Sequence, residues 1–151
     1  MSVHDRKNLK SALESAILYL QKQGVEEARQ DAWLLLEYVC GISHSTYFVH
    51  SEDEMPKEQQ EQYEALVRKR GEHIPLQQLT GEAWFYGILF FVNEHVLIPR
   101  QDTEILVEEA LRGLPKDARI LDLCTGSGCI LISLLVTRED CTGIGADLSE
   151  K

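Results

Sequence analysis

The sequence predicts an α-helical N-terminal domain, a β-hairpin linker and then the beginning of an α/β domain with a parallel sheet. Three observations support this fold class. Apolar residues recur at helical intervals as far as Gly71, aromatic and β-branched residues crowd residues 82–99, and a strand, a glycine-rich turn, a helix and a second strand follow Pro115. We therefore expect three domains, 1–73, 74–99 and 100–151, of which the last is incomplete.

Two amphipathic helices open the N-terminal domain. In residues 9–24 the apolar side chains recur every three or four positions, and Gly24 supplies a stop. Residues 26–41 repeat this pattern, begin with acids that suit a helix N-terminus and end at Gly41. The sequence therefore predicts two consecutive helices that present one apolar face each.

Two more helices complete the expected bundle. Ser43 can cap a brief helix through Tyr47. A longer helix follows, with Pro56 in its first turn and basic residues before Gly71. Because short turns join these helices, we expect a small antiparallel bundle.

The linker differs in composition from the bundle. Its segment "EAWFYGILFFVNEHVLIP" is rich in strand-forming residues, and Asn93-Glu94 separates two apolar runs, which predicts a β-hairpin or a pair of short strands. Pro99 ends it. Asp102 can then cap a helix, whose apolar residues keep helical spacing until Gly113-Leu114-Pro115 breaks it.

The remaining residues predict a strand-helix-strand unit. "ARILDLC" is a short apolar strand, "CILISLLVTR" a largely buried helix and "CTGIGADLS" a second strand, in an order typical of a parallel sheet. Two strands and one helix leave apolar surface and two open edges uncovered. We therefore expect the part after Pro115 to be poorly protected from hydrogen exchange or prone to association.

Composition limits the function classes. The 151 residues are 44% hydrophobic and 26% charged, as in ordinary soluble globular proteins. The formal net charge of −10 disfavours binding to phosphate backbones and to anionic lipid. No segment has the pattern of a signal peptide or of a membrane-spanning helix, so we expect a cytoplasmic protein without a membrane partner.

The cysteines do not predict a metal site. They form no CxxC pair and have no histidines at zinc-finger spacing, so we expect no metal. Buried free thiols are the simplest interpretation in a cytosolic protein. The cysteines concerned are Cys40, Cys124, Cys129 and Cys141.

The turn "DLCTGSG" between the first strand and its helix is the candidate binding site. Such a turn aims backbone N–H groups and the positive end of the helix dipole at one point. Gly126 and Gly128 have no Cβ, so a ligand can approach the backbone closely. Asp147 ends the next strand roughly 20 residues later, where an acid typically accepts hydrogen bonds from a ribose. Turn and acid together suggest a nucleoside ligand.

The spacing of the glycines excludes three common glycine-rich motifs. Leu131 stands where the dinucleotide pattern requires its last glycine, and no Lys-Ser/Thr follows as in a P-loop. Thr125 occupies the first glycine position of a nucleophile elbow. The pattern that fits is acid-x-x-x-G-x-G, starting at Asp122. A tight strand-to-helix turn without any ligand is the alternative interpretation.

The motifs resemble one enzyme family. "LDLCTGSG" followed by "ADLS" resembles the first two motifs of class I S-adenosylmethionine-dependent methyltransferases. "PLQQLTGEAWFYG" and "VLIPRQDTEILVE" resemble the HemK-type methyltransferases, which modify a glutamine of peptide chain release factors, and the resemblance covers essentially the whole chain. It implies a Rossmann-like α/β domain, S-adenosyl-L-methionine as cofactor, release factors as protein partners in translation termination, and methylation of a glutamine side-chain amide.

The resemblance also implies roles for individual residues. Asp147 would bind the ribose hydroxyls and Asp122 would brace the turn. Arg100 and Glu104 would line the rim of the cofactor cleft, although a capped helix start also explains that segment. The family often has glycine where this chain has Cys124, and a cysteine, although small enough for close approach, restricts the backbone more than glycine does. The residues that would wrap the methionine and adenosine parts of the cofactor are Cys124, Thr125, Gly126, Ser127 and Gly128.

One motif of the family is missing. The family orients the substrate amide with an Asn-Pro-Pro-Tyr segment, whereas all four prolines here are isolated. A catalytic domain of ordinary size would need about 100 or more further residues. We therefore expect the amide-orienting motif to lie beyond Lys151. On this interpretation residues 1–151 are an N-terminal portion that ends after its second catalytic-domain strand, contains no catalytic residue and is inactive alone.

Two alternatives remain open at this point. One is a non-catalytic protein whose helical bundle binds a release factor and whose glycine turn is vestigial. The other is a methyltransferase for adenine amino groups or for a small molecule, because Asn-Pro-Pro-Tyr-type motifs also serve adenine-amino methylation. The acidic composition and the HemK-like N-terminal segments argue against the second alternative.

Overall fold

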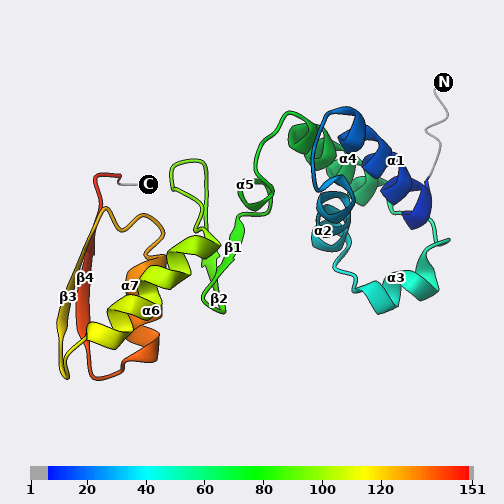
Figure 1. The fold of residues 1–151 in the computed structure, drawn as a ribbon. Helices are drawn as coiled ribbons and strands as arrows, with labels where there is room; N and C mark the ends of the chain where they lie inside the picture. Colours follow the sequence, from blue (N-terminus) through cyan, green and yellow to red (C-terminus); the bar gives the residue numbers. More distant parts are fainter. Residues whose placement is uncertain (1–6, 150–151) are drawn as a thin grey trace. The chain divides into compact units, whose positions relative to one another are not determined.

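The computed structural model describes residues 7–149, which fold as two compact units (Figure 1). The first unit ends at Thr80 and the second begins at Gly81. Each unit has a hydrophobic core of its own. The division into 1–73, 74–99 and 100–151 stays a prediction.

Lys151 lies outside the described residues, which end at Ser149. The expectation that the amide-orienting motif follows Lys151 therefore also lies outside the described residues. It stays a prediction, as does the interpretation that the chain is incomplete at this residue.

The first unit contains the four expected helices and a fifth that was not predicted. The bounds are α1 Leu9–Lys22, α2 Ala28–Cys40, α3 His44–His50, α4 Lys57–Gly71 and α5 Leu76–Thr80. The short α5 escaped prediction because five residues are too few to show helical periodicity. No helix among residues 7–149 is both long enough and apolar enough to cross a membrane.

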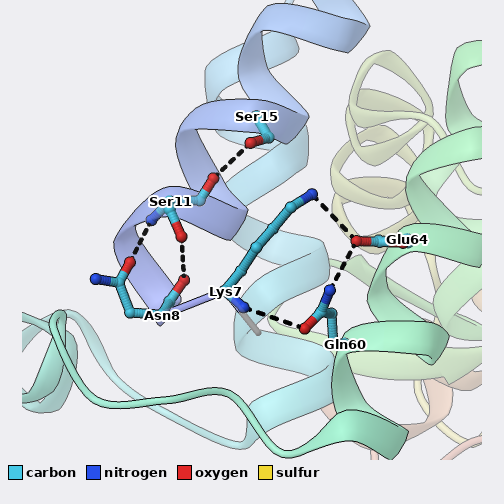
Figure 2. Close-up of polar contacts among 6 residues, drawn as sticks. All are labelled: Lys7, Asn8, Ser11, Ser15, Gln60 and Glu64. Atoms are coloured by element: carbon cyan, nitrogen blue, oxygen red, sulfur yellow. Dashed lines mark hydrogen bonds and ion pairs between the residues drawn. The ribbon is translucent and has the colours of Figure 1, made fainter. Parts of the chain in front are cut away.

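Side-chain caps set two of these helix starts. The Asn8 Oδ1 atom accepts a hydrogen bond from the Ser11 N–H at 2.8 Å and thereby begins α1 (Figure 2). The predicted Ser43 cap of α3 is confirmed, since its hydroxyl accepts from the Thr46 N–H at 3.2 Å. At the other end of α2, Gly41 takes a left-handed conformation with φ 63° and stops the helix.

The helices α1, α2 and α4 pack around one core, which includes the fully buried Leu20, Leu35 and Tyr63. The starts of α1 and α4 lie together, because the Met55 N–H donates to the Lys7 carbonyl at 3.0 Å. The ends also meet, because a Cβ on Gly71 would lie 2.6 Å from a ring carbon of Tyr19. The helices α1 and α4 therefore run parallel. The start of α2 lies at the end of α4, because Arg70 Nε donates to Asp31 Oδ2 at 2.7 Å, so α2 runs antiparallel to both, as in the expected antiparallel bundle.

The second unit begins with a β-hairpin whose turn differs from the prediction. Strands β1 (Glu82–Phe85) and β2 (Ile88–Phe91) pair antiparallel, with Phe85 opposite Ile88. The turn residues are therefore Tyr86 and Gly87, at φ 51° and 73°, the two positive values that a type I′ turn requires. Asn93-Glu94 lies after β2, so its assignment as the divider between the two runs was wrong.

The helix after the hairpin starts later than predicted. A 3-10 turn, η1, covers Gln101–Thr103, and α6 runs over Glu104–Gly113. Asp102 therefore lies inside the 3-10 turn, and its predicted role as the helix cap is wrong. The N-cap position belongs to Thr103, whose side chain makes no capping hydrogen bond.

The predicted strand-helix-strand unit is confirmed. Strand β3 (Arg119–Leu123) pairs in parallel with β4 (Thr142–Ala146), and α7 (Cys129–Thr137) lies between them in the chain. In Figure 1 the two strands lie side by side. A two-stranded sheet fits the start of an α/β domain, and the complete Rossmann-like order of strands stays a prediction.

The core of the second unit joins the hairpin to the helices. Phe85 and Phe90 pack with Val107 of α6 and with Cys129 and Leu134 of α7. The opposite face of the parallel sheet is exposed, and its apolar side chains are Leu121 at 64%, Leu123 at 67% and Ile144 at 63%. The expected weak protection of this part of the chain stays a prediction.

Candidate functional site: the glycine turn between β3 and α7

The backbone of the turn is left-handed at three positions. Cys124, Gly126 and Gly128 have φ values of 61°, 55° and 75°. A left-handed conformation costs a residue with a Cβ more than it costs glycine, so Cys124 is the strained position of the three. Gly128 adjoins the first residue of α7, and the Ile132 N–H donates to its carbonyl at 2.9 Å. The turn therefore leads directly into the N-terminus of the helix.

Asp122, near the end of β3, holds the turn in place through Thr125. Its Oδ2 atom accepts a hydrogen bond from the Thr125 hydroxyl at 2.7 Å. The backbone of Thr125 is held as well, since its N–H donates to the Ala146 carbonyl at 3.1 Å and its carbonyl accepts from the Gly128 N–H at 2.8 Å. Thr125 is thus fixed at three atoms, between the ends of the two strands and the helix.

Asp147 closes the turn from the end of β4. Its Oδ2 atom accepts from the Gly126 N–H at 2.8 Å, and its Oδ1 atom accepts from the Ser149 N–H at 2.9 Å. The N–H groups of Ser149 and Gly126 lower the pKa of Asp147, because they stabilise its charged form. A carboxylate has about four acceptor positions, so both oxygens keep a lone pair for a further donor.

Two glycines of β4 belong to the site, although the sequence reading did not single them out. A Cβ on Gly145 would lie 3.0 Å from the Thr125 hydroxyl, and a Cβ on Gly143 would lie 2.5 Å from a methyl of Leu131. The turn and α7 therefore approach the strand closely only because these positions lack side chains. The alternation of glycines in "TGIGA" is the signal that could have found them, since alternate residues share one face of a strand.

The structure does not bring every expected site residue into this hydrogen-bonded set. Ser127 is half-buried, while Cys124 and Arg100 are exposed, with Arg100 beside η1. Glu104 has a defined contact elsewhere, because its Oε1 atom accepts from the Tyr86 N–H at 2.7 Å. Glu104 therefore anchors the hairpin turn to the start of α6.

The cysteines are free thiols, as expected, but they are not all buried. Cys129 and Cys141 are buried and Cys40 is half-buried, where burial raises the pKa of its thiol. Cys124 is exposed. The prediction of burial is wrong there because Cys124 follows the exposed end of β3 in the turn.

The amino-acid sequence of the chain is similar to those of one family of known proteins. Residues 11–81 match the family of the PrmC N-terminal domain. A release factor glutamine methyltransferase from Escherichia coli is 42% identical over 128 residues, which are 84% of this chain and 46% of that protein. Proteins with the same name from Leptospira interrogans and Staphylococcus aureus are 37% and 36% identical, covering 88% and 94% of this chain and 48% and 50% of their own lengths.

The matches to these relatives cover 84% to 94% of the chain. The chain spans about half the length of the curated relatives it matches. Its sequence corresponds to their N-terminal portion. The chain therefore belongs to the HemK-type (PrmC) release factor glutamine methyltransferase family, of which it carries the N-terminal portion.

Proposed function

We propose that the chain supplies the helical unit and the first part of the S-adenosyl-L-methionine site of an enzyme that methylates the side-chain amide of a glutamine in peptide chain release factors. The names of the relatives support the reaction and the substrate class. The observation that carries the cofactor assignment is the Asp147 carboxylate held against the glycine turn by the Gly126 N–H.

The donors and acceptors of the turn fit this cofactor. Asp147 keeps a lone pair on each oxygen, which suits the two neighbouring hydroxyls of a ribose. The glycines leave the backbone open to close approach, and Asp122 keeps Thr125 in place. The residues proposed to hold the methionine and adenosine parts are Cys124, Thr125, Gly126, Ser127 and Gly128, with Arg100 and Glu104 proposed at the rim.

When bound, the cofactor supplies a methyl group on a sulfonium. The chain's own residues then have one task, which is to hold the cofactor in a fixed position, since methylation of an amide nitrogen depends on alignment. The 151 residues contain no Asn-Pro-Pro-Tyr segment to orient the amide. We therefore propose that residues 1–151 transfer no methyl group by themselves.

A chimaeric enzyme tests this function. Residues 1–151 replace the matching portion of the Escherichia coli relative, and transfer of labelled methyl from S-adenosylmethionine to a release factor is measured. We expect methylation of the release factor and none of DNA. In the chimaera, Asp147→Ala should lower transfer at least about tenfold, as for loss of a bond to a charged group. Glu139→Gln is the matched control, because Glu139 is an exposed acid of the same unit whose side chain makes no hydrogen bond within residues 7–149.

Two results would contradict the proposal. A folded chimaera that binds the release factor but neither binds nor uses S-adenosylmethionine would favour a binding module with a vestigial turn. Transfer to DNA or to a small molecule instead of the release factor would favour the other class of methyltransferase. Calorimetry with S-adenosylmethionine separates a failure of cofactor binding from a failure of substrate recognition.

A further inference from the structure

A mostly apolar groove of about 270 Å³ lies between α1 and α4 in the helical unit. It exists because α1 presents small residues to α4. We call its four buried apolar residues the groove floor. They are Ala12, Ala16, Tyr63 and Val67.

The volume suits a small ring or a branched alkyl group. An engineered apolar cavity of about 150 Å³ holds benzene, so this groove has room for a phenyl group and a short chain. The Tyr63 hydroxyl is already used, since it donates to the Ala32 carbonyl at 2.9 Å. The floor therefore offers an occupant apolar contact and no free hydroxyl.

Three charged residues line the groove beside its apolar floor, namely the cations Lys7 and Arg68 and the anion Glu64. Figure 2 shows Lys7 reaching from the start of α1 to Glu64 of α4, with 3.2 Å between its Nζ atom and the Glu64 Oε1 atom. Gln60 also donates to this oxygen, at 3.2 Å. Burial raises the pKa of Glu64, but the hydrogen bonds from Gln60 and Lys7 and the charges of Lys7 and Arg68 outweigh it and lower the pKa overall, so one anion faces two cations.

Arg68 is the second of these cations, and it acts on Glu64 only through its charge, without a direct bond. It lines the groove one turn of α4 beyond Glu64, is exposed, and forms no ion pair within residues 7–149. In a protein of net charge −10, an unpaired guanidinium beside an apolar floor is a local departure from the general repulsion of anions. Guanidinium and carboxylate match in geometry, because two parallel N–H···O bonds can form.

We propose that this groove binds a small apolar monocarboxylate, whose hydrocarbon part lies on the groove floor and whose carboxylate pairs with Arg68. The site lies in the helical unit and is independent of the proposed cofactor turn. It would give the protein a second small-molecule site of a different chemical class.

The test is a titration of the 151-residue chain with 4-phenylbutyrate, followed by NMR of the Ala12, Ala16 and Val67 methyl groups. We expect saturable shifts at these methyls. The neutral isostere 4-phenylbutyramide should bind at least about tenfold more weakly, because it loses the charge-assisted bonds. Arg68→Gln should weaken binding of the acid to the level of the amide.

Two further variants make the result decisive. Lys69→Gln removes the same charge from the next residue of α4, which does not line the groove, and should leave binding unchanged. Ser15→Leu fills the groove from its exposed rim and should abolish the shifts while the α1 backbone signals persist. The absence of saturable shifts, equal binding of acid and amide, or equal effects of Arg68→Gln and Lys69→Gln would each overturn the proposal.

Discussion

The carboxylate of Asp147 accepts a hydrogen bond from the Gly126 N–H at 2.8 Å, which ties the end of β4 to the turn that follows β3. The same carboxylate accepts from the Ser149 N–H. A single acid therefore holds the backbone of the turn at Gly126 and the backbone after β4 at Ser149.

Replacement of Asp147 by Asn should loosen the turn. One of the two acceptor oxygens becomes an amide NH₂, so one of the two backbone N–H groups loses its partner. We expect faster hydrogen exchange at Gly126, at Ser149 or at both, measured by NMR, with the β3 amides unchanged. Glu139→Gln should change neither rate. Unchanged exchange in Asp147→Asn would mean that the hydrogen bond does not hold the turn.

Gly145→Ala should damage the turn through a steric contact. The new Cβ would lie 3.0 to 3.3 Å from three atoms of Thr125, whose hydroxyl is held by Asp122 and cannot move without breaking that bond. We expect a loss of about 1–3 kcal/mol in the free energy of unfolding of residues 81–149, measured in urea by NMR.

Gly113→Ala is the matched control for this substitution. A Cβ on Gly113 would meet no atom within 4 Å, and its φ is not left-handed. Alanine favours a helix over glycine by up to about 1 kcal/mol, so this variant should be unchanged or more stable. Equal losses in the two alanine variants would contradict the role of Gly145 as the close contact of the turn.

The elements with strong periodicity were predictable from the sequence, and the connections were less so. Apolar spacing located α1 and α2, Pro56 and the basic residues before Gly71 located α4, and strand-turn-helix-strand order located β3, α7 and β4. The hairpin turn was misplaced because Asn93-Glu94 is the stronger local turn signal, whereas Tyr86 is an uncommon residue at positive φ. The structure supports Tyr86 through Glu104, which lies 18 residues away and leaves no local pattern.

In the candidate site, too, the residues were predictable from the sequence and their contacts were not. The glycines and Asp147 could be proposed from their spacing, because each stands at the end of an expected strand or the start of an expected helix. The hydrogen bond between Asp147 and Gly126 could not be predicted from the sequence, because it depends on the strand register that pairs Leu123 with Ala146. The closeness of Gly145 to Thr125 also depends on this register.

Glu104→Ala should destabilise the hairpin. The half-buried carboxylate is the partner of the Tyr86 N–H, and its loss leaves that group unpaired in a strained turn. We expect a loss of about 1.5 kcal/mol in the unfolding free energy of the second unit. Glu104→Gln keeps an acceptor oxygen and should retain most of the stability.

Glu108→Ala is the control for Glu104→Ala, because Glu108 is an exposed acid one turn later on α6. It should leave the hairpin signals unchanged in the NMR spectrum. If Glu104→Ala and Glu108→Ala have the same effect, the contact between Glu104 and Tyr86 does not stabilise the turn.

A low pH should weaken the contacts that Arg138 and Asp140 make with the segment from Leu114 to Asp117. Their side chains form two parallel bonds of 2.8 and 2.7 Å, while Arg138 also donates to the Leu114 and Pro115 carbonyls and Asp140 accepts from the Asp117 N–H. The Arg138 guanidinium, and then the Asp117 N–H, lower the pKa of Asp140 far below its ordinary value.

The sign of the pH dependence follows from this lowered pKa. The stabilisation is fully present above the unfolded pKa of about 3.9 and is lost as the pH falls through the lower folded pKa. We expect the difference in unfolding free energy between the wild type and Asp140→Asn to be constant near neutral pH and to shrink under acid. Arg138→Lys removes the parallel bonds but keeps the charge, so the Asp140 carboxyl should titrate at a higher pH by ¹³C NMR. An unchanged midpoint in Arg138→Lys would show that the two parallel bonds do not cause the low pKa.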